Sequence, residues 1–285
     1  PGVTIDHEPA NESPAMNDEG ADRGYHVRDD EQELEARRLA FLAEARDPKT
    51  CALLDRIGIT QGWHCLELGA GTGSVAAWMA DRVGAAGRVM STDIDLRFHA
   101  DPAPNMIVRD HDITTDRLPD RHFDLVHARA VLQHIPQRHD VIDTLVDALK
   151  PGGWLVLEDS HFSSFAAQPL PDAYRPLHDI ICTGQTTEWR DPDFGLALLG
   201  ELRDRGFLDL EVAGDMWAMR AGEPAGEWWF LALERAGTRL VELEIMSQAA
   251  VDAALAAVRT PGFVMTSPLS IAVCGRKPGA DRGHG

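Results

Sequence analysis

The sequence predicts an α/β fold in which a mostly parallel, seven-stranded sheet is covered by helices on both faces. Two observations lead to this prediction. Short apolar runs alternate with helical segments over residues 61–160, and this is the pattern of parallel strands joined by helical crossovers. In addition, a glycine-rich turn follows the first apolar run, and Asp93 follows the second.

The first five strands are expected where short apolar runs are bounded by polar or turn residues. They are Trp63–Leu68, Arg88–Thr92, Met106–Val108, Phe123–Ala128 and Trp154–Leu157. Helices are expected between them at Ser74–Val83 and Asp140–Leu149. Lys150-Pro151-Gly152-Gly153 then forms a turn that closes the second helix.

The second half of the chain has a weaker pattern. Residues 160–192 carry few periodic signals and several prolines. A helix is expected over Phe194–Arg205, a strand over Leu208–Val212 and a last strand over Leu269–Cys274. Residues 224–258 are rich in Ala, Leu and Glu and predict one or two helices.

The N-terminal part divides into an acidic tail and two helices. Residues 1–24 have almost no large apolar side chains, and we expect them to be disordered because they cannot bury enough surface to offset the entropy of ordering. From Asp30 to about Arg46 the apolar residues predict an amphipathic helix. Pro48 is expected to begin a second helix that ends at Gly58.

Composition excludes several classes of partner. The chain has 285 residues, and its 46 acidic and 27 basic residues give a net charge of −19. A surface of this charge repels phosphate backbones and anionic lipid, so neither nucleic acid nor membrane is an expected partner. No apolar stretch has the length of a membrane helix, and the four cysteines show no paired metal-binding spacing. A reducing, cytoplasmic location is therefore expected.

The segment Glu67–Ser74 reads Glu-Leu-Gly-Ala-Gly-Thr-Gly-Ser and follows the first predicted strand. Its glycines let the backbone turn tightly and approach a ligand closely. Asp93 ends the next strand, where a carboxylate can accept both hydroxyls of a ribose, so the two features predict an adenosine-type cofactor. The third glycine comes one residue earlier than in the dinucleotide fingerprint, which disfavours an NAD-dependent oxidoreductase.

Glu67–Gly73 resembles the first motif of class I S-adenosylmethionine-dependent methyltransferases, and the nearest type is the small-molecule group similar to the ubiquinone/menaquinone-biosynthesis enzymes. Further segments resemble later motifs of this family in the same order. They are Asp93-Ile94, Asp112-Ile113, Phe123–Val126, Leu132–Ile135 and Leu149–Gly153. The resemblance covers about residues 60–160 and implies the Rossmann-like class I methyltransferase fold with S-adenosyl-L-methionine as cofactor.

The resemblance also assigns residues to the cofactor. In the family the glycine loop surrounds the methionyl part, the acid after the second strand binds the ribose, and the pair after the third strand flanks the adenine. A tyrosine before the N-terminal helix resembles part of a cover over the cofactor. The residues implied to bind are Tyr25, Glu67, Gly69, Ala70, Gly71, Gly73, Asp93, Ile94, Asp112, Ile113, Ala128 and Arg129.

Methyl transfer to a hydroxyl or an acidic carbon requires removal of a proton near the sulfonium. His134 and His161 follow the fourth and fifth predicted strands, at the edge of the sheet where the methyl group should point. Both are candidate bases because imidazole titrates in a suitable range, and His134 is preferred. Glu158, Asp159 and His161 are a possible metal cluster, but they lack a distant matching ligand, so no metal is expected.

These features give the expected organisation of the chain. The ranges are 1–24 for the tail, 25–60 for a helical cover, 61–160 for the cofactor-binding core, 161–278 for the rest of the sheet with a helical lid at about 222–262, and 279–285 for a second tail. Trp217, Trp228, Trp229 and Phe230 lie in or near this lid, where the family inserts a variable substrate cover.

The predicted function is methyl transfer to a small-molecule acceptor in bacterial secondary or specialised metabolism. Oxygen is the preferred acceptor atom, with carbon and nitrogen as alternatives. The cofactor motifs report binding rather than transfer, so a related protein that binds the cofactor and catalyses a cyclisation remains an alternative. A protein substrate and a homodimer also remain open.

Overall fold

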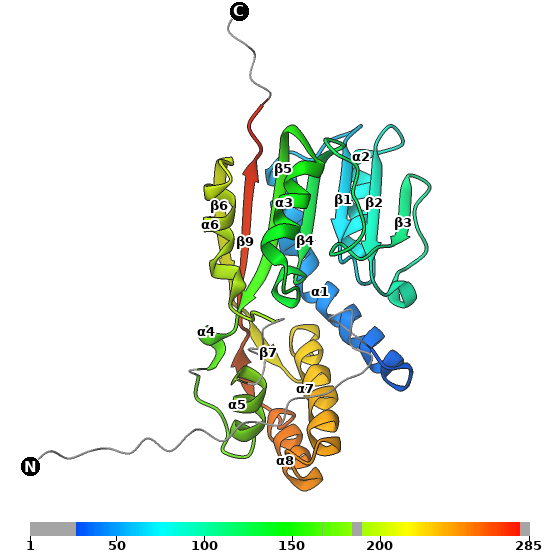
Figure 1. Ribbon diagram of the computed structural model, residues 1–285. Coiled ribbons are helices and arrows are strands. Elements are labelled where there is room, and N and C mark those ends of the chain that lie inside the picture. The colour runs from blue at the N-terminus through cyan, green and yellow to red at the C-terminus, as the bar shows by residue number, and fades with distance from the viewer. Residues whose placement is uncertain (1–26, 167, 184–189, 280–285) are drawn as a thin grey trace, which may run out of the picture.

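The computed structural model describes residues 27–166, 168–183 and 190–279. Its main feature is a seven-stranded sheet with the order β3-β2-β1-β4-β5-β9-β6 (Figure 1). The strands are β1 (His64–Leu68), β2 (Arg88–Asp93), β3 (Met106–Asp110), β4 (Phe123–Arg129), β5 (Leu149–His161), β6 (Leu208–Asp215) and β9 (Leu269–Arg276). β9 is antiparallel to both of its neighbours, and β1 to β5 are parallel. The predicted fold class is confirmed.

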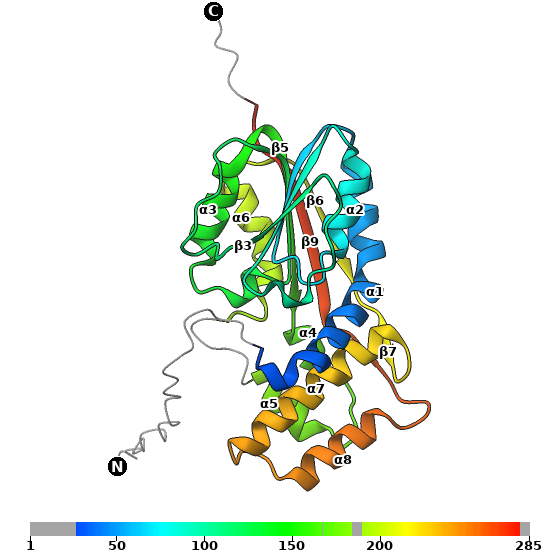
Figure 2. The same cartoon turned by 90° about the vertical axis from the view of Figure 1, so that its right-hand side faces the viewer.

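Helices cover both faces of this sheet (Figure 2). α1 (Gln32–Arg56) and α2 (Ser74–Val83) lie on one face, while α3 (Arg138–Ala148) and α6 (Leu198–Asp204) lie on the other. The central strands are nearly continuous apolar runs because each face needs its own set of side chains. Cys65 of β1 packs on the α1–α2 side and Leu66 packs on the α3–α6 side.

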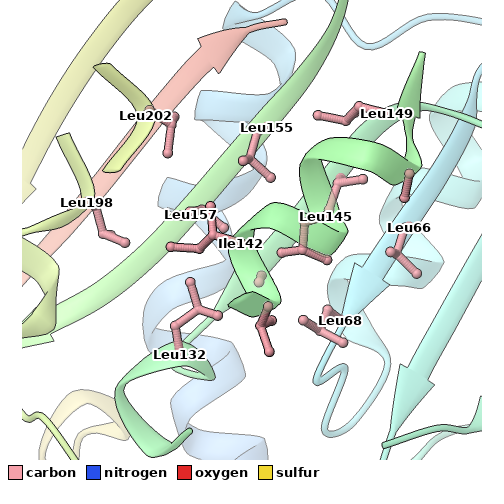
Figure 3. Packing of buried hydrophobic residues seen from close by; sticks show 14 of the residues in the cluster. Leu66, Leu68, Leu132, Ile142, Leu145, Leu149, Leu155, Leu157, Leu198 and Leu202 are labelled. Carbon is pink, nitrogen blue, oxygen red and sulfur yellow. The ribbon is translucent and has the colours of Figure 1, made fainter. Parts of the chain in front are cut away.

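The core under α3 and α6 consists almost entirely of aliphatic side chains (Figure 3). Leu66 of β1, Leu145 of α3 and Leu155 of β5 are all fully buried in it. Removing one buried leucine side chain from such a core costs about 2–5 kcal/mol. The sheet edge that bears the loops after β1, β2 and β4 is therefore held on a rigid base.

α1 is one continuous helix of 25 residues that contains Pro48, so the prediction of two helices was wrong. A proline inside a helix removes a hydrogen bond and costs about 3 kcal/mol. The helix continues because both halves are packed: the first half lies beside α7 (Pro224–Glu242), and the second lies on the sheet beside α2 (Figure 2). Leu53 and Leu54 of the second half are buried in the core.

The second half of the chain also builds a separate helical layer below the sheet (Figure 1). It contains α4 (Ser163–Ala166), α5 (Arg175–Thr183), α7, α8 (Gln248–Val258) and a two-stranded sheet of β7 (Ala218–Arg220) and β8 (Val264–Thr266). Its aromatic core includes Phe165, Trp229 and Phe230, and Phe41 and Leu42 of α1 pack against it. α1 thus joins the sheet to this helical layer, in which only α7 and α8 fall within the range predicted for the lid.

The described helices include none that is both long enough and apolar enough to pass through a bilayer. All four cysteines are free thiols. The predicted acidic tail of residues 1–24 lies outside the described residues, as does most of the predicted tail of residues 279–285.

Candidate functional site

The glycine loop joins β1 to α2 and has three glycines in the left-handed region, with φ of 66° at Gly69, 54° at Gly71 and 76° at Gly73. A Cβ atom on Gly69 would lie 2.3 Å from Val131 Cγ2, and one on Gly73 would lie 2.5 Å from the His99 ring. These two positions therefore need glycine for packing. Gly71 differs, because the nearest atom to its Cβ position is 3.9 Å away.

The Asp93 carboxylate lies beside this loop and is bonded to its backbone. One carboxylate oxygen, Oδ2, accepts the Gly71 N–H at 2.7 Å, and Oδ1 accepts the Asp95 N–H at 3.0 Å. Burial raises the pKa of Asp93, and backbone donors only partly oppose it. The open space at Gly71 beside a carboxylate fits the ribose and methionyl parts of S-adenosylmethionine, because hydroxyls can donate to the remaining lone pairs.

The other residues assigned to the cofactor lie along the same sheet edge. Ile94 is half-buried after β2, and Ala128 is buried near the end of β4. Asp112 accepts the Thr114 N–H at 2.9 Å and so shapes the turn after β3. Ile113 is buried in the core under α3, so its side chain packs there.

Two further residues were assigned to the cofactor. Ala70 donates its N–H to Thr92 O at 3.0 Å, which ties the loop to β2. Tyr25 lies outside the described residues.

The N-terminal residues lie across this edge. Leu39 of α1 supplies the atom nearest to the Gly71 Cβ position. Arg97, in the loop after β2, donates to Val27 O and to Asp29 Oδ1, both at 2.8 Å. Val27 is buried. The start of the described chain is therefore held against the loop that carries Asp93, on the side where the cofactor is expected.

A chain of buried charges lies behind the glycine loop, between the sheet and α1. Glu67 Oε2 of β1 is 2.6 Å from His127 Nδ1 of β4, and His127 Nε2 is 3.1 Å from Glu158 Oε1 of β5. All three side chains are 6% exposed or less. With a carboxylate at each ring nitrogen, both nitrogens of His127 must donate, so the imidazole carries a positive charge.

α1 continues this chain of charges. Thr50 donates to Glu158 Oε1 at 2.7 Å, and Arg46 pairs with Glu158 Oε2 at 3.5 Å. Arg46 also donates to Ser270 of β9. Four strands and α1 are therefore joined through hydrogen-bonded polar groups that are removed from water.

Arg129, at the end of β4, was assigned to the cofactor but turns toward α1. Its guanidinium donates to Asp47 Oδ1 at 2.7 Å and to Thr50 at 2.9 Å. This leaves its backbone carbonyl as the group that can contact a ligand. The side chain instead adds a second ionic link between α1 and the sheet.

The pKa values follow from this arrangement. Burial by itself would lower the pKa of His127, but Glu67 and Glu158 outweigh it and raise the pKa to about 9. Burial would raise the pKa of Glu158, but the hydrogen bond and charge of His127, with Arg46 and Arg129, lower it to about 2. The stable state is therefore an imidazolium between two carboxylates.

The two candidate bases lie in different surroundings. His134 is half-buried in the short helix η3 (Leu132–His134), and burial together with nearby arginines lowers its pKa to about 3. His161 ends β5, and its Nδ1 lies 2.9 Å from Asp193 Oδ1. At neutral pH His134 is uncharged and weakly basic in this state, whereas His161 lies beside the carboxylate of Asp193.

Glu158 and Asp159 lie on opposite faces of β5. Glu158 contacts His127, whereas Asp159 Oδ2 accepts the Gln133 N–H of η3 at 3.3 Å. These two acids therefore do not form one ligand set with His161. Across residues 27–166, 168–183 and 190–279, no group of three or more His, Cys, Asp and Glu side chains is placed to hold a metal ion.

A model of the family described as a methyltransferase domain matches residues 27–240, which is more than half of the chain. The chain belongs to the methyltransferase domain family. This confirms the recognition of a class I S-adenosylmethionine-dependent methyltransferase. The matched region begins at the N-terminal cover and includes the glycine loop, Asp93 and the buried charges.

Curated relatives match part of this methyltransferase. Methyltransferase str2 of Strobilurus tenacellus is 28% identical over 149 residues, which are 51% of this chain and 53% of the relative. The ubiquinone/menaquinone biosynthesis C-methyltransferase UbiE of Pseudomonas fluorescens is 29% identical over 147 residues, which are 47% of this chain and 57% of the relative. The chain thus spans little more than half the length of these relatives.

Solved structures share the fold. A protein from Bacillus halodurans C-125, provisionally named a methyltransferase, is 19% identical with a TM-score of 0.52, covering 80% of this chain and 98% of that chain. The [4+2]-cyclase SpnF is also 19% identical, with a TM-score of 0.50. The match covers 83% of this chain and 82% of the SpnF chain. At this identity the likeness establishes the fold alone.

Sequence reasoning did not find His127, Arg46 or Thr50. A signal for part of the network was present, because Glu67, His127 and Glu158 are polar residues inside otherwise apolar strands. Glu67 and His127 are also direct neighbours in the register of β1 and β4. Such residues are buried only when they are paired. The partners on α1 lie far away in the sequence and become visible only in the fold.

We expect His127→Gln to destabilise this methyltransferase in a pH-dependent way. The folded pKa of about 9 exceeds the ordinary 6.5, so the stabilisation from protonated His127 is complete below pH 6.5 and is lost as the pH rises through 9. Urea unfolding should show a deficit of about 3 kcal/mol at pH 6 that narrows at about pH 10.

His139→Gln is the matched control, because the His139 side chain is 61% exposed and pairs only with Glu201 among the described carboxylates. It should have a small effect at both pH values. A deficit of His127→Gln that stays constant across this pH range would contradict a charged imidazole.

Proposed function

We propose that this protein transfers a methyl group from S-adenosylmethionine to a small-molecule acceptor, preferentially at oxygen, as a cytoplasmic enzyme of bacterial specialised metabolism. The observation that carries the proposal is the open left-handed loop at Gly71, which faces the carboxylate of Asp93. Membership of the methyltransferase domain family supports methyl transfer. The UbiE relative is named as a C-methyltransferase of ubiquinone/menaquinone biosynthesis, which supports a small acceptor and makes carbon the alternative acceptor atom.

Each part of the loop has a separate task in this proposal. The N–H of Gly71 donates to Asp93 and so aims the carboxylate at the open space. Gly69 and Gly73 allow Val131 and His99 to pack closely, which fixes the loop. When bound, S-adenosylmethionine supplies an electrophilic methyl group on a sulfonium. The protein then contributes mainly orientation, exclusion of water and removal of a proton.

The proton would be taken at one of the two histidines. His161 has a carboxylate partner, Asp193, and this partner also accepts the Ser163 N–H at 2.8 Å, so its position is fixed. A histidine whose position is fixed in this way is suited to general-base catalysis. His134 can act as a base only if the positive charge around it is neutralised when the acceptor binds.

We expect Gly71→Ala to lower the affinity for S-adenosylhomocysteine at least about tenfold, because a methyl group would fill the space meant for the ligand. Gly152→Ala is the matched control. Gly152 also has positive φ, of 82°, with no atom within 4 Å of its Cβ position, and it lies in the turn at the start of β5.

In both variants, alanine in the left-handed region strains the backbone by about 1–2 kcal/mol. The melting temperatures of the two variants should therefore fall by similar amounts. Titration calorimetry should show weaker binding of S-adenosylhomocysteine in Gly71→Ala than in Gly152→Ala. Equal affinity in the two variants would show that the space at Gly71 does not hold the cofactor.

The reaction itself is tested with S-adenosylmethionine that carries a deuterated methyl group. The purified protein is incubated with a panel of phenols, hydroxybenzoates and catechols, and the products are examined by mass spectrometry. We expect a product heavier by one labelled methyl group, together with S-adenosylhomocysteine. A rearranged product of unchanged mass with the cofactor intact would instead indicate cyclisation, the reaction named for SpnF.

A further inference from the structure

β6 is one of the two end strands of the seven-stranded sheet, and β3 is the other (Figure 1). An end strand has a neighbour on one side only, so alternate residues direct their N–H and C=O groups away from the sheet. Proteins usually protect such an edge with charged side chains or a bulge, because it can otherwise pair with another strand. The two end strands differ in this protection.

β3 is protected by charge, whereas the second half of β6 is not. Arg109 and Asp110 are consecutive exposed charged residues in β3. In β6 the pairing with β9 shifts register between Leu208 and Glu211, which interrupts the edge only at the start of the strand. The segment Val212-Ala213-Gly214 that follows is exposed, uncharged and regularly paired with β9. Its outer edge is therefore open to a further strand.

An apolar groove lies directly beside this part of β6. It has a volume of about 240 Å³ and is lined by residues of β6, β9, α6 and the short helix η4 (Phe194–Leu196). Leu196, Leu199 and Val212 line it and are 60%, 39% and 52% exposed. An apolar cavity of about 150 Å³ holds a benzene molecule, so this groove has room for an aliphatic side chain from outside. Contiguous apolar surface of this kind is typical of an interaction site.

The same surface supplies both parts of a contact. The groove can receive an apolar side chain, and the exposed Leu196 and Leu199 can provide one. A two-fold axis perpendicular to the sheet places two copies of β6 side by side in antiparallel orientation and keeps α6 of both copies on the same face. Leu196 and Leu199 of each copy then face the groove of the other copy. Self-complementary surface of this kind favours a second copy of the chain as the partner.

The charges along β6 also allow a second copy to approach. The net charge of the chain is −19, so two copies repel each other over most of their surfaces. The residues that line the groove are uncharged. On the face that α1 covers, Glu211 pairs with Arg56 at 3.1 Å and Asp215 pairs with Lys49 at 3.6 Å. The acidic residues at this edge are therefore compensated within each copy.

We propose that the protein forms a homodimer in which β6 of one copy pairs antiparallel with β6 of a second copy. η4 and α6 of each copy would cover the groove of the other, and the two sheets would join into one. Each copy keeps its own glycine loop, because β4, β5 and β9 separate β1 from β6.

Light scattering coupled to size-exclusion chromatography on the full chain measures this association. We expect the wild type to have twice the mass of one chain. Val212→Arg and Leu199→Arg should each weaken the dimer at least about tenfold, because each would bury an unpaired charge between the copies. Both residues are exposed in a single copy, so the variants should fold, and circular dichroism checks this.

Ile107→Arg is the matched control, because Ile107 is 44% exposed on β3, at the other end of the sheet. This variant should keep the mass of the wild type.

Amide hydrogen exchange of the wild type tests the strand pairing without any variant. A dimer becomes more populated as the protein concentration rises. We therefore expect exchange in residues 211–215 to slow with concentration, because outward N–H groups of β6 gain partners, while exchange in β3 stays unchanged.

The proposal is overturned if the wild type remains a monomer at every concentration. The groove would then be left for residues 1–26 of this chain or for a different protein. A dimer that persists in both Val212→Arg and Leu199→Arg, or that Ile107→Arg weakens equally, would also overturn it, because the interface would then lie elsewhere.

Discussion

The imidazole of His127, held between the carboxylates of Glu67 and Glu158, is the interaction on which the site depends. Taking each of these ions out of water costs several kcal/mol, and only close partners on every side offset that cost. Here the partners come from β1, β4, β5 and, through Arg46 and Thr50, from α1. Loss of His127 would remove the hydrogen-bond partner that the buried Glu67 side chain has here and one of the partners of Glu158.

This requirement ties two distant parts of the chain together. Glu67 stands two residues before Gly69, so the network fixes the strand from which the glycine loop starts. Arg46 and Thr50 fix the middle of α1 on the same face of the sheet. The first half of α1 is then directed over the sheet edge, where Leu39 reaches Gly71 (Figure 2). The glycine loop and the first half of α1 are therefore positioned by a single set of buried charges.

The same helix also links the glycine loop to the helical layer that contains α7. Glu35 is fully buried and pairs with Arg235 of α7 as well as with Arg38. α1 therefore contacts the glycine loop through Leu39 and the aromatic layer around Trp229 through Phe41 and Leu42. A rigid α1 can hold these surfaces at a fixed spacing, which is what in-line transfer between two bound molecules requires.

The sequence was sufficient for the parts of the fold that depend on local pattern. The five parallel strands, the glycine loop and Asp93 follow from short apolar runs and from glycines where the backbone turns. The continuity of α1 through Pro48 was not predictable in this way, because it depends on packing against α7 and the sheet. α5 was missed, and the direction of Arg129 was unforeseen, for the same reason: each is set by partners distant in the sequence.

The charge on His127 is the most direct test of this account. Histidine-selective NMR of the intact protein, with the signal assigned by His127→Gln, measures it without any substrate. The account predicts that both ring nitrogens of His127 remain protonated at neutral pH and that the ring titrates near pH 9. A His127 that titrates at or below its ordinary 6.5 would show that the buried chain is not ionic and would contradict the account.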